Sequence, residues 1–374
     1  MGASQFPPFG MSSGQSEDAD VAIIGAGIVG LAIAYRLSNL NKRVLVIEKE
    51  TEPGKGITSG QANVIHVVQL PFGSLKSKLA RKGNTMYDDL CRELGVRLNR
   101  VPSLLVVRGW LRLPILFFVY LYLRFALRGQ FKVQLMRGRS LRMIEPLLAD
   151  GISGGIVVNG YGTVDAQSLV LRLKEAAEKR GVVFWFGCEL TSCSREGEST
   201  LLKTTCGDVK AMFVVNAAGL YSDDVARMLG RDLGRLEPGL GVMAVYSGLD
   251  LKAIVAPLPL SIGSRTKGGA IIPATDGTTI VGPTLRVART RDEHEYTEED
   301  LTLLRSKFRP LLKEEGELVR VYTGVRPLSP TRDFIIDLDG TKKAVNLVGI
   351  ESPGLTAAPA IAELVVGMIT GVSA

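Results

Sequence analysis

The apolar residues near the start of the chain change their spacing from one typical of a strand to one typical of a helix and back. Residues 20–50, DVAIIGAGIVGLAIAYRLSNLNKRVLVIEKE, begin with an apolar run, pass through a glycine-rich turn into a helix with an apolar face, and end with a second apolar run that closes on an acid. A short apolar run beside glycines indicates a buried strand, and apolar residues three and four apart indicate a helix. The segment therefore predicts a strand, a tight turn, a helix and a second strand.

Later segments repeat this alternation, and one long segment does not. Residues 162–190 predict a capped helix and a strand, residues 212–230 a strand, a small-residue turn and a helix, and residues 344–371 a strand, a glycine turn and a helix. In residues 236–330, short apolar runs are broken by glycine and proline, which predicts an antiparallel sheet. We therefore expect an α/β protein with a Rossmann-like nucleotide-binding domain interleaved with an antiparallel β-rich domain.

These changes of character suggest domain boundaries. Residues 1–19 are rich in Gly, Ser and Pro without apolar periodicity, so we expect a loose tail there. The rest is divided into a nucleotide-binding domain from residues 20–100, 145–235 and 331–374, an apolar and basic insertion from residues 101–144, and a β-rich substrate domain from residues 236–330.

The distribution of charge argues against nucleic-acid binding. The 374 residues carry a formal net charge of +7 and are 46% apolar, which suits an enzyme-sized protein with two domains that share one site. Residues 103–144 contain no Asp or Glu, and their basic residues alone exceed the whole surplus. These basic residues are Arg108, Arg112, Arg124, Arg128, Lys132, Arg137, Arg139 and Arg142.

The cysteines show no spacing typical of a metal site or a disulfide framework. Cys91, Cys188, Cys193 and Cys206 form no CxxC or Cys/His pattern, and the N-terminus lacks the pattern of a secretion signal. We therefore expect unpaired thiols, no bound metal and a reducing cytoplasmic setting.

The glycine turn within residues 20–50 indicates a dinucleotide site. Gly25 permits the tight turn, Gly27 lets the backbone approach a pyrophosphate, and Gly30 lets the helix lie close to the strand. Glu48 lies about twenty residues further on, where an acid binds a ribose hydroxyl and disfavours the 2′-phosphate of NADP. The phosphates are expected at the helix N-terminus, whose N–H groups attract anions. The motif alone leaves FAD and NAD open.

Two later segments favour FAD. Residues 162–190 and the strand, AAG turn and helix of residues 212–230 resemble the additional nucleotide-domain elements of flavoproteins in the D-amino-acid oxidase and glycerol-3-phosphate dehydrogenase superfamily. The resemblance covers nearly the whole chain and implies a fold similar to that of D-amino-acid oxidase and glutathione reductase, with the AAG turn near the FAD phosphates. The cofactor residues that it implies in these parts are Gly25, Gly27, Gly30, Glu48, Lys49, Glu189, Ala218 and Gly219.

Residues 56–66, GITSGQANVIH, resemble the family segment that passes along the flavin ring. The resemblance assigns Thr58, Ser59 and Asn63 to the cofactor and places His66 beside flavin N5. Oxidation of an alcohol needs a base for the hydroxyl proton as hydride leaves, and a histidine suits this role because it titrates near neutral pH. Covalent attachment of the flavin and a structural role stay open as alternatives for His66.

The segment GIESPGLTAAPAIAE, which starts at residue 349, resembles the C-terminal flavin-binding turn of the same superfamily. A helix N-terminus aimed at the pyrimidine edge of the flavin would stabilise the negative charge that collects at N1 and O2 on reduction. The resemblance therefore assigns to the cofactor Gly349, Gly354, Leu355 and Thr356.

Two arginine motifs point to an anionic substrate. The sequences GVRPL, with Arg326, and TRDF, with Arg332, resemble the pair that glycerol-3-phosphate dehydrogenases use for the anionic end of their substrate. Arginine presents planar, bidentate donors that match phosphate or carboxylate oxygens and keeps its charge. Lys267, before a GG turn, is expected to add a further positive charge.

Residues 110–128, WLRLPILFFVYLYLRFALR, are more apolar than the resemblance leads us to expect. Their uncharged run, LPILFFVYLYL, is too short to cross a bilayer, which takes about twenty residues. Aromatic and leucine side chains flanked by arginine favour a helix lying in the interface of an anionic membrane. Docking of a partner protein and an ordinary buried helix stay open.

Together, the residues and the resemblance predict an FAD-dependent dehydrogenase that oxidises sn-glycerol 3-phosphate to dihydroxyacetone phosphate by hydride transfer to flavin N5 and passes electrons to a quinone or another carrier. The expected location is the cytoplasm, either free or peripheral on the inner face of the cell membrane. The alternatives are a 2-hydroxy-acid dehydrogenase similar to the L-2-hydroxyglutarate enzymes, an amino-acid oxidase or dehydrogenase, and a non-catalytic flavoprotein subunit. The expected partners are a small anionic substrate and, through residues 110–128, a membrane surface or a partner subunit, but no nucleic acid.

Overall fold

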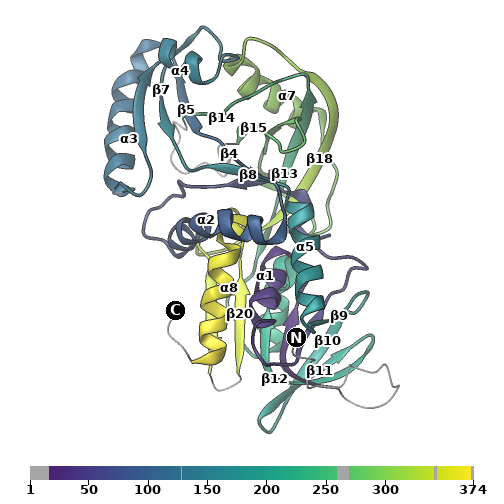
Figure 1. Cartoon of the computed structure of the whole chain (residues 1–374). Coiled ribbons are helices and arrows are strands. Elements are labelled where there is room, and N and C mark those ends of the chain that lie inside the picture. Colours follow the sequence, from purple (N-terminus) through teal and green to yellow (C-terminus); the bar gives the residue numbers. More distant parts are fainter. Residues whose placement is uncertain (1–16, 128, 259–268, 341–342, 372–374) are drawn as a thin grey trace.

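The computed structural model describes residues 17–127, 129–258, 269–340 and 343–371. Figure 1 shows two parts, one above the other, each built on its own sheet, with helix α2 (Leu75–Leu94) lying across the boundary between them. The predicted α/β fold, a Rossmann-like domain interleaved with an antiparallel domain, is confirmed.

The lower sheet has a parallel centre. β1 lies between β2 and β12 and runs parallel to both, so the carboxyl ends of these strands meet at one edge. Among the described residues the order is β10-β11-β12-β1-β2-β9, with β20 beside β12 and β19 beside β20. The strands are β1 (Glu17–Ile24), β2 (Val44–Ile47), β9 (Val183–Trp185), β10 (Leu190–Glu196), β11 (Ser199–Thr204), β12 (Gly207–Asn216), β19 (Ile335–Asp339) and β20 (Ala344–Val348).

Both faces of this sheet are covered, which explains the continuous apolar run of β1. Val21 and Ile23 face a core shared with helices α1 (Ile28–Leu37), α5 (Ala166–Lys179) and α8 (Gly354–Thr370). The alternate residues Ala22 and Ile24 face a second core that includes side chains of helix α6 (Ser222–Met228).

The upper sheet draws its strands from more of the chain than we expected. In the described part, its order is β17-β13-β16-β15-β14-β5-β7-β6, and β18 pairs with β13. β5 and β6 come from the expected insertion, and β7 comes from a range expected in the nucleotide-binding domain. The difference arises because β5 joins the sheet through long-range pairing with β14, which no local pattern reveals. The strands are β5 (Ser103–Arg108), β6 (Val133–Arg137), β7 (Ile152–Val158), β13 (Glu237–Ser247), β14 (Ile254–Pro257), β15 (Ala270–Pro273), β16 (Thr279–Gly282), β17 (Arg286–Val287) and β18 (Glu317–Leu328).

Shorter elements complete the two parts. A small sheet of β3, β8 and β4 lies near the boundary in Figure 1. The elements not yet given are β3 (Val64–Ile65), β4 (Leu98–Arg100), β8 (Gly162–Val164), helices α3 (Leu113–Ala126), α4 (Gly138–Ile144) and α7 (Glu298–Phe308), and the 3-10 turns η1 (Ile57–Gly60), η2 (Trp110–Arg112), η3 (Gly219–Tyr221) and η4 (Arg309–Leu311).

The apolar segment before β6 folds as η2 and α3 on the outside of the upper part. Leu116 and Leu123 of α3 are buried, whereas the side chains of Trp110, Phe118 and Phe125 are 74%, 69% and 73% exposed. The alternative of an ordinary buried helix is therefore wrong. None of the helices in the described ranges is long and apolar enough to span a membrane.

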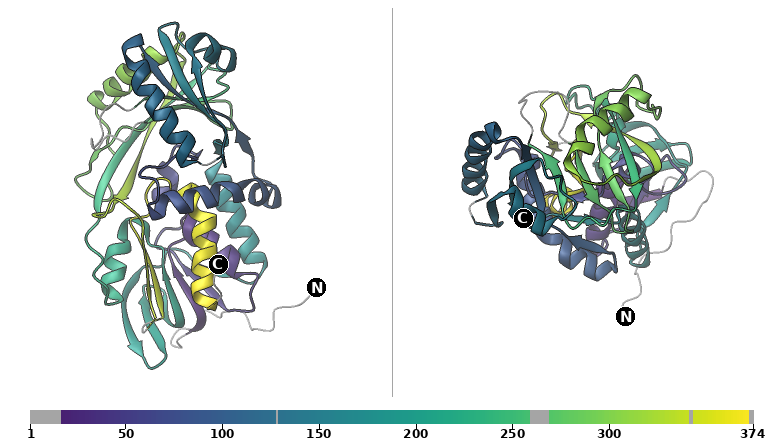
Figure 2. Two further views of the ribbon diagram at one scale, coloured as in Figure 1. Left: turned by 90° about the vertical axis from the view of Figure 1, so that its left-hand side faces the viewer. Right: turned by 90° about the horizontal axis from the view of Figure 1, so that it is seen from above.

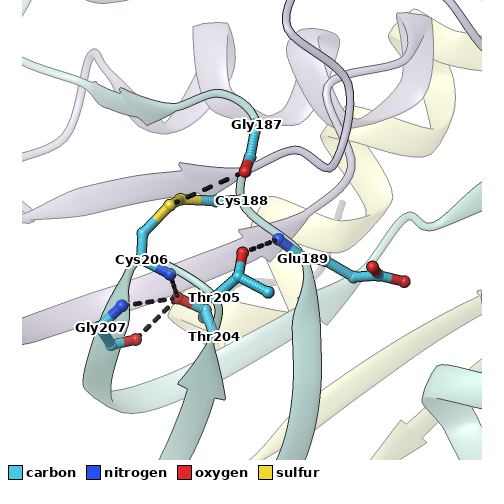
Figure 3. The surroundings of a disulfide bond; sticks show 7 residues. All are labelled: Gly187, Cys188, Glu189, Thr204, Thr205, Cys206 and Gly207. Carbon is cyan, nitrogen blue, oxygen red and sulfur yellow. Dashed lines mark hydrogen bonds between the residues drawn. A yellow bond between two sulfur atoms is a disulfide. The ribbon is translucent and has the colours of Figure 1, made fainter.

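A disulfide joins Cys188 and Cys206, whose Cα atoms are 5.6 Å apart (Figure 3). Cys188 follows β9, and Cys206 lies in the turn between β11 and β12. The expectation of unpaired thiols is wrong for this pair, because folding of the hairpin brings together residues 18 positions apart that share no recognisable motif. Cys91 and Cys193 lie outside the disulfide.

Candidate cofactor and substrate site

The turn after β1 is tight because its glycines meet neighbouring backbone. Gly25 has a φ of +106°, and a Cβ at this position would lie 2.5 Å from the carbonyl oxygen of Ala217 and 3.3 Å from the Cα of Ala218. A Cβ at Gly30 would collide with the carbonyl of Gly25. The turn, the start of α1 and the AAG turn after β12 therefore approach one another as only glycine allows at these two positions.

Residues after β2 and in η1 form hydrogen bonds with the backbone at the start of α1. Gly27 is the N-cap of α1, and the next N–H, that of Ile28, donates to the Thr58 hydroxyl at 3.1 Å. The Glu48 carboxylate, just after β2, accepts a hydrogen bond from the N–H of Ala26 at 2.6 Å. Glu48 therefore bonds the glycine turn at Ala26, and Thr58 bonds the first residue of α1, which lies thirty residues before it in the chain.

The AAG turn closes the same edge of the lower sheet. Gly219 has a φ of +59°, and a Cβ there would lie 3.1 Å from the side chain of Ile57 in η1. The Lys49 ammonium lies 4.0 Å from the ring centroid of Tyr221, at the end of η3. The ends of β1, β2 and β12 and the η1 turn therefore form one continuous surface.

For three other residues that the resemblance assigns to the cofactor, the structure shows only local features of their own loops. Ser59 is exposed, and its hydroxyl donates to the carbonyl of Lys55 at 2.9 Å. Asn63 has a left-handed φ of +59° that shapes the entry to β3. Glu189 is exposed, and Figure 3 shows its side chain directed away from the disulfide. No contact of these side chains with the glycine turn is seen in the described chain.

His66 is held in place through its backbone. Its N–H donates to the Thr356 hydroxyl of α8 at 3.0 Å, and its carbonyl accepts from the Asn84 side chain of α2 at 2.9 Å. Its ring is half-buried and lies edge-on to Tyr161, with centroids 6.1 Å apart. Burial raises the pKa of the Tyr161 hydroxyl to about 12, so this neighbour stays neutral. Two helices therefore fix the backbone of His66, and its ring lies beside a neutral aromatic side chain.

The start of α8 packs closely against its surroundings. Gly349 has a φ of +69°, and a Cβ there would lie 2.6 Å from the Cβ of Ser329 in the turn after β18. Gly354 begins α8, and the carbonyl of Leu355 accepts a hydrogen bond from the buried Tyr87 hydroxyl at 2.5 Å. The Thr356 hydroxyl is occupied by β3 and His66, so its role is to join α8 to the His66 segment.

Arg326 extends from β18 toward the boundary between the two parts. Alternate residues of a strand share a face, and on the face of Arg326 the Tyr322 hydroxyl donates to the carbonyl of Gln61 at 2.9 Å while Gly324 packs directly on Gly60 of η1. The guanidinium lies over Gly241 of β13, where a Cβ would come within 3.1 Å of it. Arg326 thus lies on the face of β18 whose neighbouring residues contact η1.

The electrostatic setting of Arg326 differs from that of a surface arginine. Burial lowers the pKa of its guanidinium, and the negative charge of Glu351 opposes that shift. Within the described residues, no hydrogen bond or salt bridge engages the guanidinium. A half-buried arginine without such partners is a candidate for binding an anion, because its planar donors match phosphate or carboxylate oxygens.

Arg332 has a different environment from the one its motif predicts. It lies in the turn between β18 and β19 with a left-handed φ of +58°, and its side chain is exposed. Its backbone carbonyl accepts a hydrogen bond from the Lys76 ammonium. The paired guanidinium groups expected from the sequence are therefore not seen in contact, since Arg326 points from a strand and Arg332 from an exposed turn. Lys267 lies outside the described residues.

A buried ionic network that sequence reasoning missed lies next to Arg326. The Lys76 ammonium is 3.5 Å from the Glu351 carboxylate, and the two residues are 3% and 5% exposed. Asp333 accepts hydrogen bonds from the N–H groups of Leu75 and Lys76, at 2.8 and 2.9 Å, at the start of α2. A signal was present, because Lys76 occupies the same helical stripe as buried residues of α2, but a lysine is normally assigned to the solvated face.

The chain is similar to known proteins over nearly its whole length. Residues 20–368 match the model of a family described as FAD dependent oxidoreductase. The chain is 29% identical over 361 residues to a glycerol 3-phosphate dehydrogenase of Caloramator mitchellensis, covering 95% of this chain and 74% of that protein. It is 27% identical over 374 residues to a glycerol 3-phosphate oxidase of Mycoplasma pneumoniae, covering 94% and 95%. The structure of a dithionite-reduced L-α-glycerophosphate oxidase of Mycoplasma pneumoniae with FAD bound is similar, with a TM-score of 0.87, 24% identity and 95% coverage of both chains.

The residues present fit an FAD cofactor. Side chains at the glycine positions 25 and 30 would fill the narrow turn between β1, α1 and the AAG turn, and the Glu48 carboxylate lies at the edge of that turn. Acidic side chains at the end of the second strand bind ribose hydroxyls in this type of fold. Gly25, Gly27 and Glu48 are therefore the residues that would hold the nucleotide part, with the η1 segment and the start of α8 on either side of His66.

Proposed function

Because the chain belongs to the FAD dependent oxidoreductase family, we propose that it oxidises sn-glycerol 3-phosphate at C2 to dihydroxyacetone phosphate. Its nature as an FAD-dependent oxidoreductase similar to glycerol-3-phosphate dehydrogenases is confirmed, and the proposal concerns its substrate, mechanism and acceptor. The observation that carries the proposal is Arg326, whose half-buried guanidinium has no hydrogen-bond or salt-bridge partner in the described residues and which lies on the strand face that contacts η1.

In the proposed reaction, the C–H and O–H bonds at C2 break and a carbonyl bond forms. Bound FAD would supply the acceptor for the hydride, which is the C2 hydrogen with its electron pair. His66 takes the hydroxyl proton, and the contacts from Thr356 and Asn84 fix its backbone for that task. Arg326 binds the phosphate with two parallel donors, so that C2 is presented to His66 at a fixed distance.

The buried Lys76–Glu351 pair positions Arg326 in this scheme. The Glu351 carboxylate is 3.5 Å from the Lys76 ammonium, and its negative charge also acts on the Arg326 guanidinium. If Lys76 neutralises Glu351, the Arg326 guanidinium stays available for the substrate anion. We propose further that the electrons pass to a quinone or another carrier, with the enzyme peripheral at a membrane.

The first test is an anaerobic titration of the purified flavoprotein with sn-glycerol 3-phosphate, and separately with L-2-hydroxyglutarate and with amino acids. Loss of flavin absorbance with the phosphate ester is expected. Reduction by a carboxylate substrate alone would overturn the proposed reaction while keeping Arg326 as the anion site.

A pair of variants tests the role of Arg326. Arg326→Met is expected to raise KM for the phosphate ester by about tenfold to a hundredfold, the range for loss of a charged hydrogen bond. Arg320→Met is the matched control, because Arg320 lies on the same strand but is exposed. Equal KM values in the two variants would remove Arg326 from the substrate site.

A further inference from the structure

The outer side of η2 and α3 forms an apolar surface that no other described element covers. Figures 1 and 2 show α3 along the outer edge of the upper part. This α3 surface consists of Trp110, Leu111, Leu113, Ile115, Phe117, Phe118, Leu121, Tyr122 and Phe125. With about 150–250 Å² for each large side chain, their exposed fractions amount to on the order of 1,000 Å². The largest apolar patch on a typical monomer is about 300–600 Å².

The inner side of α3 fixes the helix on the protein. Leu116 and Leu123, two turns apart, are buried in a core with Leu127 and with Ile156 of β7. Because these contacts already satisfy one face, the exposed aromatic side chains on the other face are not required for folding of the upper part. Apart from Arg124, the outer face of α3 is apolar, whereas a surface helix of a globular protein usually presents a polar face to water.

The charged residues next to the α3 surface along the chain are basic, and we call them its basic rim. Arg108 and Arg112 are exposed at its start, and Arg124 and Lys132 are exposed at its end. No Asp or Glu occurs between residues 103 and 144. At the C-terminal end, Arg124, Phe125, Phe131 and Lys132 line a hollow of about 490 Å³, which combines two cations with two aromatic rings.

The positive charge of the rim favours an anionic phospholipid surface over a second copy of this chain as the partner of the α3 surface. A two-fold dimer through α3 would bring the same basic rim of a second copy against it, since both copies use one patch. Like charges at that distance repel, whereas an anionic phospholipid surface supplies both an apolar layer for the aromatic side chains and negative charge for the arginines. The helix, about 21 Å long at 1.5 Å per residue, is shorter than the roughly 30 Å hydrocarbon core and suits an orientation parallel to the bilayer.

We propose that the α3 surface docks on an anionic phospholipid bilayer, with Trp110, Phe118 and Phe125 in the interface and the basic rim on the headgroups. This deepens the proposed function, because it rests on the placement of the enzyme at a membrane and names the surface responsible. Its test does not use substrate, so failure of the docking and failure of the proposed reaction are distinguishable.

The test is sedimentation of the FAD-loaded protein with vesicles of phosphatidylcholine alone or mixed with phosphatidylglycerol. Binding to the mixed vesicles is expected to exceed binding to neutral ones by about tenfold or more and to fall with salt, because each basic residue near an anionic surface contributes about fivefold. Arg112→Gln with Arg124→Gln is expected to lose about twenty-five-fold on the same basis.

The decisive variant replaces Trp110, Phe118 and Phe125 by serine, with a control that replaces three exposed apolar residues elsewhere, Leu171, Met212 and Val319, by serine. The α3 variant is expected to lose vesicle binding by at least about tenfold while keeping its flavin spectrum and turnover with a soluble dye, and the control is expected to bind as the unaltered protein does.

Two outcomes would overturn the proposal. The first is equal binding of the α3 variant and the control by folded, flavin-loaded protein. The second is a concentration-dependent dimer without lipid that the α3 variant abolishes while vesicles bind neither protein, which would assign the surface to a second copy of the chain.

Discussion

Replacement of Lys76 by methionine tests the buried network that links the substrate and cofactor segments. Lys76 and Glu351 are 3% and 5% exposed, and their charged atoms are 3.5 Å apart. At that distance the gross attraction is about 5 kcal/mol with an effective dielectric constant of about 20. Methionine keeps most of the volume, so the main effect is a buried carboxylate without its lysine, which typically costs about 3–5 kcal/mol. We expect the lower end, about 3 kcal/mol, because the positive charge of Arg326 also acts on Glu351.

The same change should weaken substrate binding. Without Lys76, the charge of Glu351 acts more strongly on Arg326, and pairing of Arg326 with that carboxylate competes with the substrate anion. We therefore expect a lower free energy of unfolding and a higher KM together. Urea unfolding of the flavin-loaded protein, followed by circular dichroism and flavin fluorescence, measures the first effect, and steady-state kinetics the second.

Two further variants make the test specific. Lys78→Met, two residues along α2 at an exposed position, is expected to change the free energy of unfolding by less than about 0.5 kcal/mol. The double variant Lys76→Met with Glu351→Gln is expected to recover more than half of the loss, because the buried charge is removed with its partner. If Lys76→Met and Lys78→Met were equally stable, or if the two changes at the network were simply additive, the reasoning would be refuted.

Three other predictions follow from single features. His66→Ala is expected to lower kcat by about 10²–10⁴-fold, and unchanged turnover would exclude His66 as the base. Denaturation of the unaltered protein is expected to release free flavin, because His66 is proposed as a base and not as a covalent attachment. Gly324→Val is expected to destabilise the protein by at least about 1–3 kcal/mol, because its side chain would collide with the backbone of η1. Gly56→Val, which has open space around it, is the control in the same thermal unfolding experiment. Burial raises the pKa of the Cys91 thiol to about 11, so it is expected to resist a thiol reagent at pH 8 in the native protein, and Cys206 to react only after reductant; rapid labelling of either without reductant would contradict the structure.

The parts of the site that could be predicted from sequence are those encoded locally. Gly25, Gly30 and Glu48 follow one another within a single strand–helix–strand unit, so their spacing already specifies the turn. Arg326 was predicted because its motif resembles one used for anions, and its binding of the substrate stays a prediction. The Cys188–Cys206 disulfide and the pairing of β5 with β14 were missed, since each depends on how distant segments meet and leaves no periodic pattern.

Helix α2 shows why long-range contacts decide the working geometry. The sequence presents it as a basic helix, yet its first turn receives Asp333 from the arginine turn, and its buried lysine pairs with Glu351 before α8. About two turns further along the same helix, the Asn84 side chain donates a hydrogen bond to the carbonyl of His66. Helix α2 therefore connects the turn that carries Arg332 and Asp333 to the segment that carries the proposed base. Any change that tilts α2 should alter KM and kcat together, which is why the Lys76 variant is more informative than a change at either end.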